Sequence, residues 1–222
     1  MWIRNFVLIG SSQYPDVDTP GDSPTGGEGQ LGFLMGTNRF EVSGCTISKV
    51  WGDGFYVTHG SSDVWIHDNH VISAGRNGMA VICGTDIIAE RNTFDTCGYH
   101  TFDVEPSVAA DVCTTIICRL NTAGTYGQSG QYFFNIYNPN SSTIDGVIVD
   151  DNTVLGDSLS AYVYSEGSVR TKHVTFTNNE GELANVGPDF FFTYIDGLTA
   201  TGNVQSLSSG VLMNITDCTG TW

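Results

Sequence analysis

Basic residues are scarce in this chain: its 222 residues include 8 Lys and Arg against 24 Asp and Glu, a formal net charge of −16. A field of that sign repels phosphate backbones and anionic lipids, so we expect no nucleic acid and no membrane as partner. Charged residues of both signs make up only 14%, whereas glycine is frequent, with 27 residues. This balance favours a sheet-rich, turn-rich fold, and the acidity is typical of a soluble extracellular or virion-associated protein.

Long apolar segments and closely paired cysteines are also missing. Residues 1–9 form too short an apolar stretch for a signal peptide or a membrane insertion, and their pattern is that of a strand within a coil. We therefore expect a single domain over residues 1–222, either complete or a fragment of a longer chain. The six cysteines show no CxxC pair and no Cys/His metal spacing, which favours buried free thiols over disulfides.

A repeated strand pattern organises the chain. Segments such as 64–71, 87–94 and 147–154 share an apolar alternation that ends at an asparagine. This asparagine recurs at positions 69, 92, 121, 152, 179 and 203, so successive gaps are 23, 29, 31, 27 and 24 residues. A minimum period near 23 with additions of variable length is typical of a solenoid whose loops leave at its corners. The pattern predicts an all-β fold, a right-handed parallel β-helix of about seven or eight coils.

Alternation with period 2 predicts which side chains of each coil face the core. In the first strand of each coil we expect two inward rows, one of Phe40, Val64, Ile87, Ile116, Val147, Val174 and Leu198, the other of Val42, Ile66, Ala89, Cys118, Val149, Phe176 and Ala200. The asparagines follow these strands, where we expect them to adopt unusual backbone angles and to bond one another as a ladder. Residues 11–37, rich in Gly, Ser, Asp and Pro, are predicted to form a long loop that leaves the first coil and walls a groove.

Three successive coils carry the strongest cluster of polar candidates. A second strand begins about ten residues after the turn, with Phe55, Met79 and Phe102 expected inward and in register. Along each of these strands, the side chains that alternate with the inward ones then face outward, and strands of successive coils lie roughly 4.8 Å apart. The candidate site residues on these rungs and their corners are Asp53, Tyr56, His59, Arg76, Tyr99, His100, Asp103 and Glu105.

Asp103 and Glu105 are the expected acid–base pair. They are two residues apart on one strand face, roughly 6.5–7 Å, a separation suited to inverting glycoside hydrolysis. His100 is a further catalytic candidate as general acid or base, a role that Tyr99 also allows, and Arg76 would neutralise a substrate carboxylate. Asp53, Arg76, Tyr56, Tyr99 and His59 are the expected substrate-binding residues.

Two other interpretations of these residues remain open. Asp53, Asp103 and Glu105 would together suit a Ca²⁺ ion, the one cofactor that the pattern suggests. Alternatively, the Asp-Gly at 53–54 and the Asn-Gly at 77–78 only form tight corners, and the two later carboxylates are solvated or paired with Arg76. Later coils also hold more aromatic residues than one inward face can use, so some must face outward, where they would bind sugars or a neighbouring subunit.

The recurring Val-x-Ile-x-x-Asn-x-Val coil, followed by Gly-Asp-Gly-Phe at 52–55, Gly-Arg-Asn-Gly-Met at 75–79 and Phe-Asp-Val-Glu-Pro at 102–106, resembles the pectate-lyase-like superfamily. That group includes polysaccharide lyases, polygalacturonases, alginate C5-epimerases and phage tailspike depolymerases. The resemblance implies a polysaccharide partner and, through the tailspikes, a homotrimer as one assembly. Residues 103–105 read Asp-Val-Glu where the epimerases carry Asp-Pro-His, and the Gly-His-Gly of polygalacturonases is missing, although His59-Gly60 is present.

Two functions follow from these observations. The first is a carbohydrate-active β-helix, a polysaccharide hydrolase or lyase, that binds and cleaves its substrate in a groove on coils 1–3. The second is a non-catalytic receptor-binding or structural solenoid of the phage-tail or cell-surface type. A concave groove at Asp53, Asp103 and Glu105 would favour the first, and an open flat face would favour the second.

Overall fold

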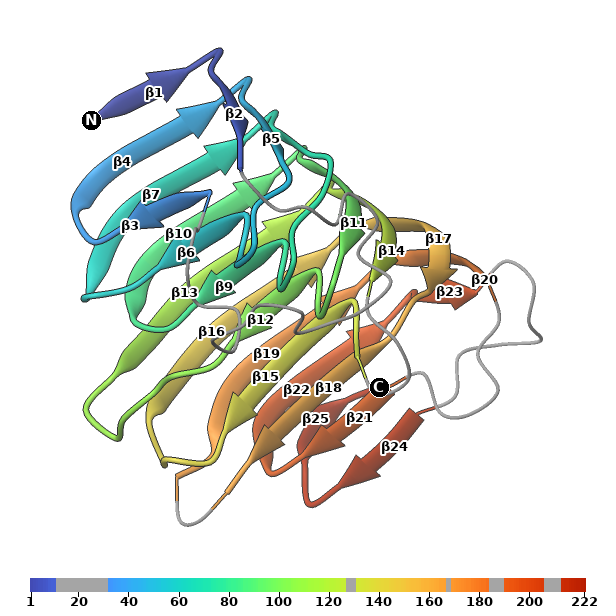
Figure 1. Ribbon diagram of the computed structural model, residues 1–222. Coiled ribbons are helices and arrows are strands. Elements are labelled where there is room, and N and C mark those ends of the chain that lie inside the picture. Colours follow the sequence, from blue (N-terminus) through green and yellow to red (C-terminus); the bar gives the residue numbers. More distant parts are fainter. Residues whose placement is uncertain (11–31, 127–130, 167–168, 184–189, 206–212) are drawn as a thin grey trace.

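Three parallel β-sheets surround one axis, and the chain passes through each of them once per coil (Figure 1). The computed structural model describes residues 1–10, 32–126, 131–166, 169–183, 190–205 and 213–222. Within these ranges every regular element is a strand, and the described residues thus include no helix that could span a membrane. The sheets contain nine, eight and eight strands, all paired in parallel. The predicted parallel β-helix is therefore confirmed.

Consecutive strands of each sheet come from successive coils. Sheet A contains, in order along the axis, β1 (Trp2–Arg4), β4 (Asn38–Ser43), β7 (Ser61–His67), β10 (Gly84–Glu90), β13 (Val112–Arg119), β16 (Thr143–Asp150), β19 (Thr171–Thr177), β22 (Ile195–Thr201) and β25 (Thr219–Thr221). Sheet B contains β2 (Val7–Ile9), β5 (Thr46–Ser48), β8 (His70–Val71), β11 (Thr93–Cys97), β14 (Thr122–Tyr126), β17 (Thr153–Ser158), β20 (Glu180–Leu183) and β23 (Val204–Gln205). Sheet C contains β3 (Phe33–Met35), β6 (Phe55–Val57), β9 (Met79–Val81), β12 (Phe102–Val104), β15 (Phe134–Asn138), β18 (Ala161–Ser165), β21 (Phe190–Thr193) and β24 (Met213–Thr216).

The predicted loop over residues 11–37 is too long at its C-terminal end. Phe33–Met35 form β3, which pairs with β6 from Phe33 and Phe55 onward. This strand escaped prediction because three residues beside a Gly-rich stretch are too few to show an alternation. Residues 11–31 lie outside the described ranges, so the groove wall expected from them stays a prediction.

The two inward rows predicted for sheet A form one wall of the core. Phe40 is the most exposed of their members, at only 6%, and its Cα partner in the next coil is Val64, as the register requires. Sheet C contributes large rings such as Phe102, which is 1% exposed. One continuous apolar core therefore extends along the axis. The six cysteines are free, and Cys118 lies in this core as expected.

The asparagines that follow the sheet A strands form the predicted ladder. The Nδ2 atom of Asn121 donates to Asn152 Oδ1 and to the carbonyl of Ala89, both at 3.0 Å. Its Oδ1 atom accepts from the backbone N–H and the Nδ2 atom of Asn92, at 2.9 and 3.1 Å. Asn121 is 1% exposed. Asn121 thus makes every hydrogen bond that its side chain offers, and each of its bonds to another asparagine joins two coils.

The unusual backbone angle belongs to the residue before each ladder asparagine, which corrects the sequence-based expectation. Asp68, Arg91 and Leu120 have φ angles of 54°, 52° and 55°, in the left-handed region. Arg and Leu rarely adopt this conformation, because it brings Cβ close to the following carbonyl oxygen. The bonds of the following asparagine hold the corner closed, so residues without any left-handed preference occupy it.

We expect Asn121→Ala to destabilise the protein by about 2–4 kcal/mol, because it removes the acceptor of the buried Asn92 N–H and one donor each to Asn152 Oδ1 and the Ala89 carbonyl. Urea unfolding followed by circular dichroism measures this change. The control is Asn214→Ala, at an exposed asparagine of β24, for which we expect less than about 0.5 kcal/mol. Equal unfolding midpoints for the two variants would contradict the role of the ladder.

Candidate functional site

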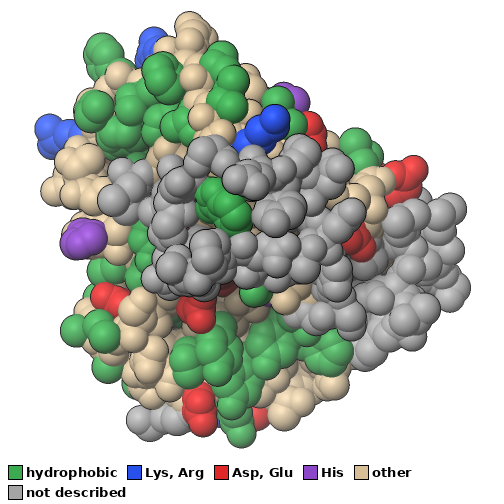
Figure 2. All heavy atoms as spheres, in the orientation of Figure 1, with side chains coloured by type: hydrophobic (Ala, Val, Ile, Leu, Met, Phe, Trp, Pro, Cys, Tyr) green, Lys and Arg blue, Asp and Glu red, His purple; other side chains and the backbone are tan. Residues whose placement is uncertain are grey.

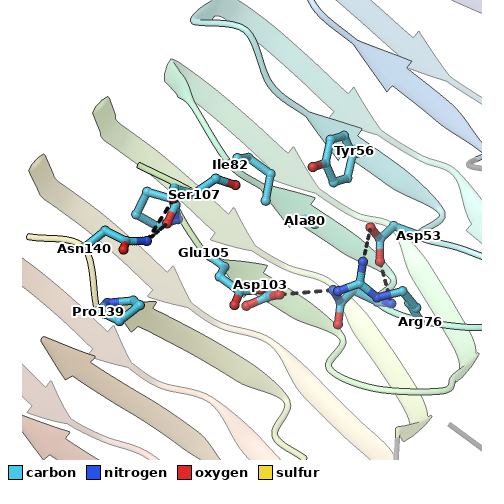
Figure 3. A pocket seen from close by; sticks show the side chains of 12 residues that line it. Asp53, Tyr56, Arg76, Ala80, Ile82, Asp103, Glu105, Ser107, Pro139 and Asn140 are labelled. Carbon is cyan, nitrogen blue, oxygen red and sulfur yellow. Dashed lines mark hydrogen bonds and ion pairs between the residues drawn. The ribbon is translucent and has the colours of Figure 1, made fainter. Parts of the chain in front are cut away.

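A groove lies on the outward face of sheet C, over β6, β9, β12 and β15. It consists of two adjoining hollows of about 250 and 450 Å³, and both are lined by Arg76, Asn77, Asp103 and Glu105. Further residues of the first hollow include Asp53, Tyr56, Ile82, Ser107 and Asn140 (Figure 3). Those of the second are Tyr99, His100, Gln131, Tyr132, Asn135, Tyr137 and Tyr162. The predicted patch is therefore concave.

A column of side chains at the corner before sheet C positions the polar groups. Each member accepts the backbone N–H of its successor one coil later: Asp53 Oδ1 from Asn77 (2.8 Å), Asn77 Oδ1 from His100 (3.1 Å) and His100 Nδ1 from Tyr132 (2.9 Å). Gly54 permits the close approach of coils here, since a Cβ atom on it would lie 2.6 Å from a backbone oxygen of the next coil. The same residues therefore both close the corner and line the groove.

Asp103 is the buried centre of the groove. It lies in register with Ala80 and Asn135 and faces outward from sheet C, yet it is only 3% exposed. Its Oδ2 atom accepts from Asn77 Nδ2 (3.1 Å) and its Oδ1 atom from Asn135 Nδ2 (2.8 Å). Burial raises its pKa to about 6, against the two amides and the Arg76 charge, which favour the ionised form. Asp103 is therefore mostly ionised at neutral pH and protonates in mildly acidic solution.

Asp53 is a fully buried carboxyl group at the end of the first hollow. It is 0% exposed, and its Oδ2 atom has no hydrogen-bond partner among the described residues. Arg76 Nη1 lies 4.0 Å from that atom (Figure 3), and the Arg76 guanidinium also stacks 5.9 Å from the ring centroid of Tyr99. Burial raises the pKa of Asp53 to about 7, although Arg76 opposes the shift. Arg76 thus serves as the counter-charge for buried carboxylates.

His100 is neutral in this environment. Burial lowers its pKa to about 4, and the nearby Arg76 charge acts in the same direction. Because Nδ1 accepts the Tyr132 N–H, the fitting neutral tautomer carries its proton on Nε2. The ring also stacks on Tyr132, with centroids 5.8 Å apart. These contacts make His100 a hydrogen-bond donor in the groove wall rather than a base.

The structure places the remaining candidates as follows. Tyr56 and Glu105 line the first hollow, and Tyr99 lines the second, as the pattern predicts. His59 is not among the lining residues of either hollow. It is exposed at the corner after β6, with a φ of 55°, because the strand ends at Val57 and the outward alternation stops there.

The groove residues that are missing from the sequence-based site include Asn135, Tyr132 and Tyr162. A signal exists, since Phe134-Asn135-Ile136 repeats the apolar–polar–apolar pattern of β12. It is concealed by a gap of 32 residues between Asp103 and Asn135, compared with 23 residues between Ala80 and Asp103. The longer connection makes the register between β12 and β15 hard to recognise from the sequence.

The carboxylates of the groove do not form a metal centre. Across the described ranges, no three His, Cys, Asp or Glu side chains converge closely enough to hold a metal ion. The guanidinium of Arg76 also lies beside Asp53, where a second cation would be repelled. The geometry therefore gives the Ca²⁺ interpretation no support.

Three parallel sheets around one core, with a polar groove on one outer face, define a parallel β-helix protein. Residues 35–203 match the family described as "Right handed beta helix region", and the chain belongs to this family. The match bears out the resemblance to pectate-lyase-like β-helices at the level of the fold. Neither the comparison with curated proteins nor that with solved structures found a match.

The buried carboxyl of Asp53 makes a pH dependence of stability testable. Its pKa is about 7 in the folded protein and about 4 in an unfolded chain. Between these values the folded protein holds a proton that the unfolded chain has released, so stability falls as pH rises from about 4 to about 7. We expect this group to contribute a slope of about 1.4 kcal/mol per pH unit, and Asp53→Asn to remove it.

Urea unfolding at one-unit intervals between about pH 4 and about pH 8 measures this slope. The matched control is Asp86→Asn, because Asp86 is exposed on β10 and outside the groove. It should keep the slope of the unmodified protein. If the free energy of unfolding changed with pH in the same way for Asp53→Asn and the unmodified protein, the raised pKa of Asp53 would be contradicted.

Proposed function

We propose that this protein binds a polysaccharide in the groove of sheet C and cleaves it by hydrolysis. One observation carries the proposal: a buried carboxylate with a pKa near 6 lies beside Glu105 in a groove whose far end is lined by tyrosines. Sugar-binding sites commonly combine such polar groups with aromatic surface. A polysaccharide ligand also suits the expected extracellular or virion-associated location.

Asp103 takes the role of the base. Both of its oxygens accept amide hydrogen bonds, which favour the charged form, so it is suited to receive a proton from water. Glu105 takes the role of the acid, and it lies two residues further along the same face of the chain (Figure 3). Such a spacing is about 6.5–7 Å, at the lower end of the carboxyl separation of inverting glycosidases.

A non-catalytic binding module is the second candidate. It is favoured by the saturation of Asp103, whose two oxygens are both engaged with amides and which is only 3% exposed. In that case the carboxylate would fix Asn77 and Asn135 for hydrogen bonding to sugar hydroxyls. Both candidates place a polysaccharide in the groove, and they differ in whether its bonds are broken.

A panel of neutral and uronate-containing polysaccharides separates the two candidates. We expect new reducing ends without the ultraviolet absorbance of unsaturated products, since hydrolysis adds water across the glycosidic bond. Glu105→Gln and Asp103→Asn should each lower kcat about 10²- to 10⁴-fold, because each removes an acid or base group. Asp86→Asn, an exposed carboxyl away from the groove, serves as the matched control and should retain the rate.

Unsaturated ends would instead assign an elimination reaction. Silence across the panel, with the protein folded and a polysaccharide bound, would assign the non-catalytic module.

The pH profile tests the role of Asp103 directly. A base acts in its ionised form, so kcat/KM should rise with pH through about 6, and loss of the Glu105 proton should lower it again at higher pH. Initial rates on the cleaved polysaccharide, measured between about pH 4 and about pH 8, give the profile. A rate that falls through about pH 6 would make Asp103 the acid and overturn the assignment.

A further inference from the structure

We infer that the groove selects a neutral glycan and discriminates against polyuronates. The inference rests on the proposed polysaccharide binding and adds the chemical class of the sugar. It is carried by the charges and polar groups that line the two hollows, together with the aromatic surface beside them.

The charge of the groove opposes a substrate carboxylate. Among the described residues that line the two hollows, Arg76 is the one basic side chain, whereas Asp53, Asp103 and Glu105 are acidic. Arg76 is already committed, with Nη1 4.0 Å from a carboxylate oxygen and its guanidinium against the ring of Tyr99. Its side chain is 17% exposed. A uronate carboxylate would therefore meet like charges without an available cation, and such a juxtaposition weakens binding.

The uncharged part of the lining is suited to sugar hydroxyl groups. The side-chain amides of Asn77 and Asn135 line the groove, largely buried and each bonded to Asp103, and His100 is neutral above about pH 4. Burial raises the pKa of the phenols of Tyr132 and Tyr162, so both stay protonated at neutral pH. These groups donate and accept hydrogen bonds without carrying charge, as hydroxyl recognition requires.

An aromatic surface continues the groove toward the C-terminal coils. The ring centroids of Tyr132 and Tyr162 lie 5.1 Å apart, and Tyr162 lies 6.3 Å from Phe191 and 6.1 Å from Tyr164. These half-buried rings belong to the outward faces of β18 and β21 and the corner before β15. In Figure 2 the coloured atoms over this part of sheet C include hydrophobic and acidic side chains and no blue one.

Rings of this kind suit the carbon–hydrogen faces of uncharged pyranoses. They offer apolar surface that is rigid before binding, and the phenolic hydroxyls at their edges add polar contacts. A polyuronate would have to bring its carboxylates over the same apolar surface, which strips them of water with no compensating charge. Charge and aromatic surface therefore select the same class of ligand.

Isothermal titration calorimetry on the full 222-residue chain tests the inference. Each uronate polymer, including polygalacturonate and alginate, is paired with its carboxyl-reduced form, which keeps the linkages and loses the charge. Neutral glucans, mannans and xylans complete the panel, with and without Ca²⁺. For a backbone that binds, the neutral form should bind at least about tenfold more tightly at low salt, and added salt should narrow the difference.

The outcomes separate this inference from the proposed function. Equal or tighter binding of a uronate, in either Ca²⁺ condition, would overturn the neutral preference while polysaccharide binding stands. No binding by any member of the panel would overturn the proposed function, and the inference with it.

The aromatic surface has its own test. Tyr162→Ala should weaken binding of the neutral glycan about tenfold, and Tyr162→Phe should retain most of the affinity, because the ring supplies the contact. The matched control is Trp65→Ala, an aromatic that is 39% exposed on sheet A, which should leave the affinity unchanged. Circular dichroism confirms that each variant is folded. Unchanged affinity of a folded Tyr162→Ala protein would overturn the placement of the glycan on this surface.

Discussion

The stacking of successive coils in one fixed register is the constraint on which this structure depends. The asparagine ladder secures it, because each buried amide is satisfied only when the next coil is level with it, as Asn92, Asn121 and Asn152 show. A slip of one residue would turn every core side chain toward solvent. The same register brings Asp103 level with Asn135 across a coil that is longer by several residues. The groove is therefore a consequence of how the core is held together.

Two carboxyl groups of the groove lie in electrostatically unfavourable surroundings. Asp53 and Asp103 are both buried, with pKa values raised to about 7 and about 6, and Arg76 is the charge that opposes both shifts. On sheet A, by contrast, Glu90 and Arg119 form an ion pair of 2.7 Å. Natural proteins tolerate such costs mainly where function requires them. This contrast is why the groove, and not the charged face of sheet A, is the candidate site.

The two ends of the groove offer different groups for the proposed binding of a polysaccharide. At one end, the corner column from Asp53 to His100 fixes polar groups whose positions depend on backbone hydrogen bonds between coils. At the other end, Tyr132 and Tyr162 present rings that are held by stacking on their neighbours. Both ends are rigid because each residue is tied to the coil before or after it. A site preorganised in this way loses little conformational entropy when a ligand binds.

The sequence by itself determined the solenoid, the two inward rows of sheet A, the asparagine ladder and the patch that contains Asp103, because these features repeat at a short and nearly constant period. Only the tertiary structure decided that Asp103 is held by two amides, that His59 lies outside the groove and that Arg76 faces Asp53. These facts depend on loops of variable length that reset the register, and on burial by neighbouring coils. A pKa near 6 for a strand carboxylate has no local signature, since its cause is the side chains that surround it in three dimensions.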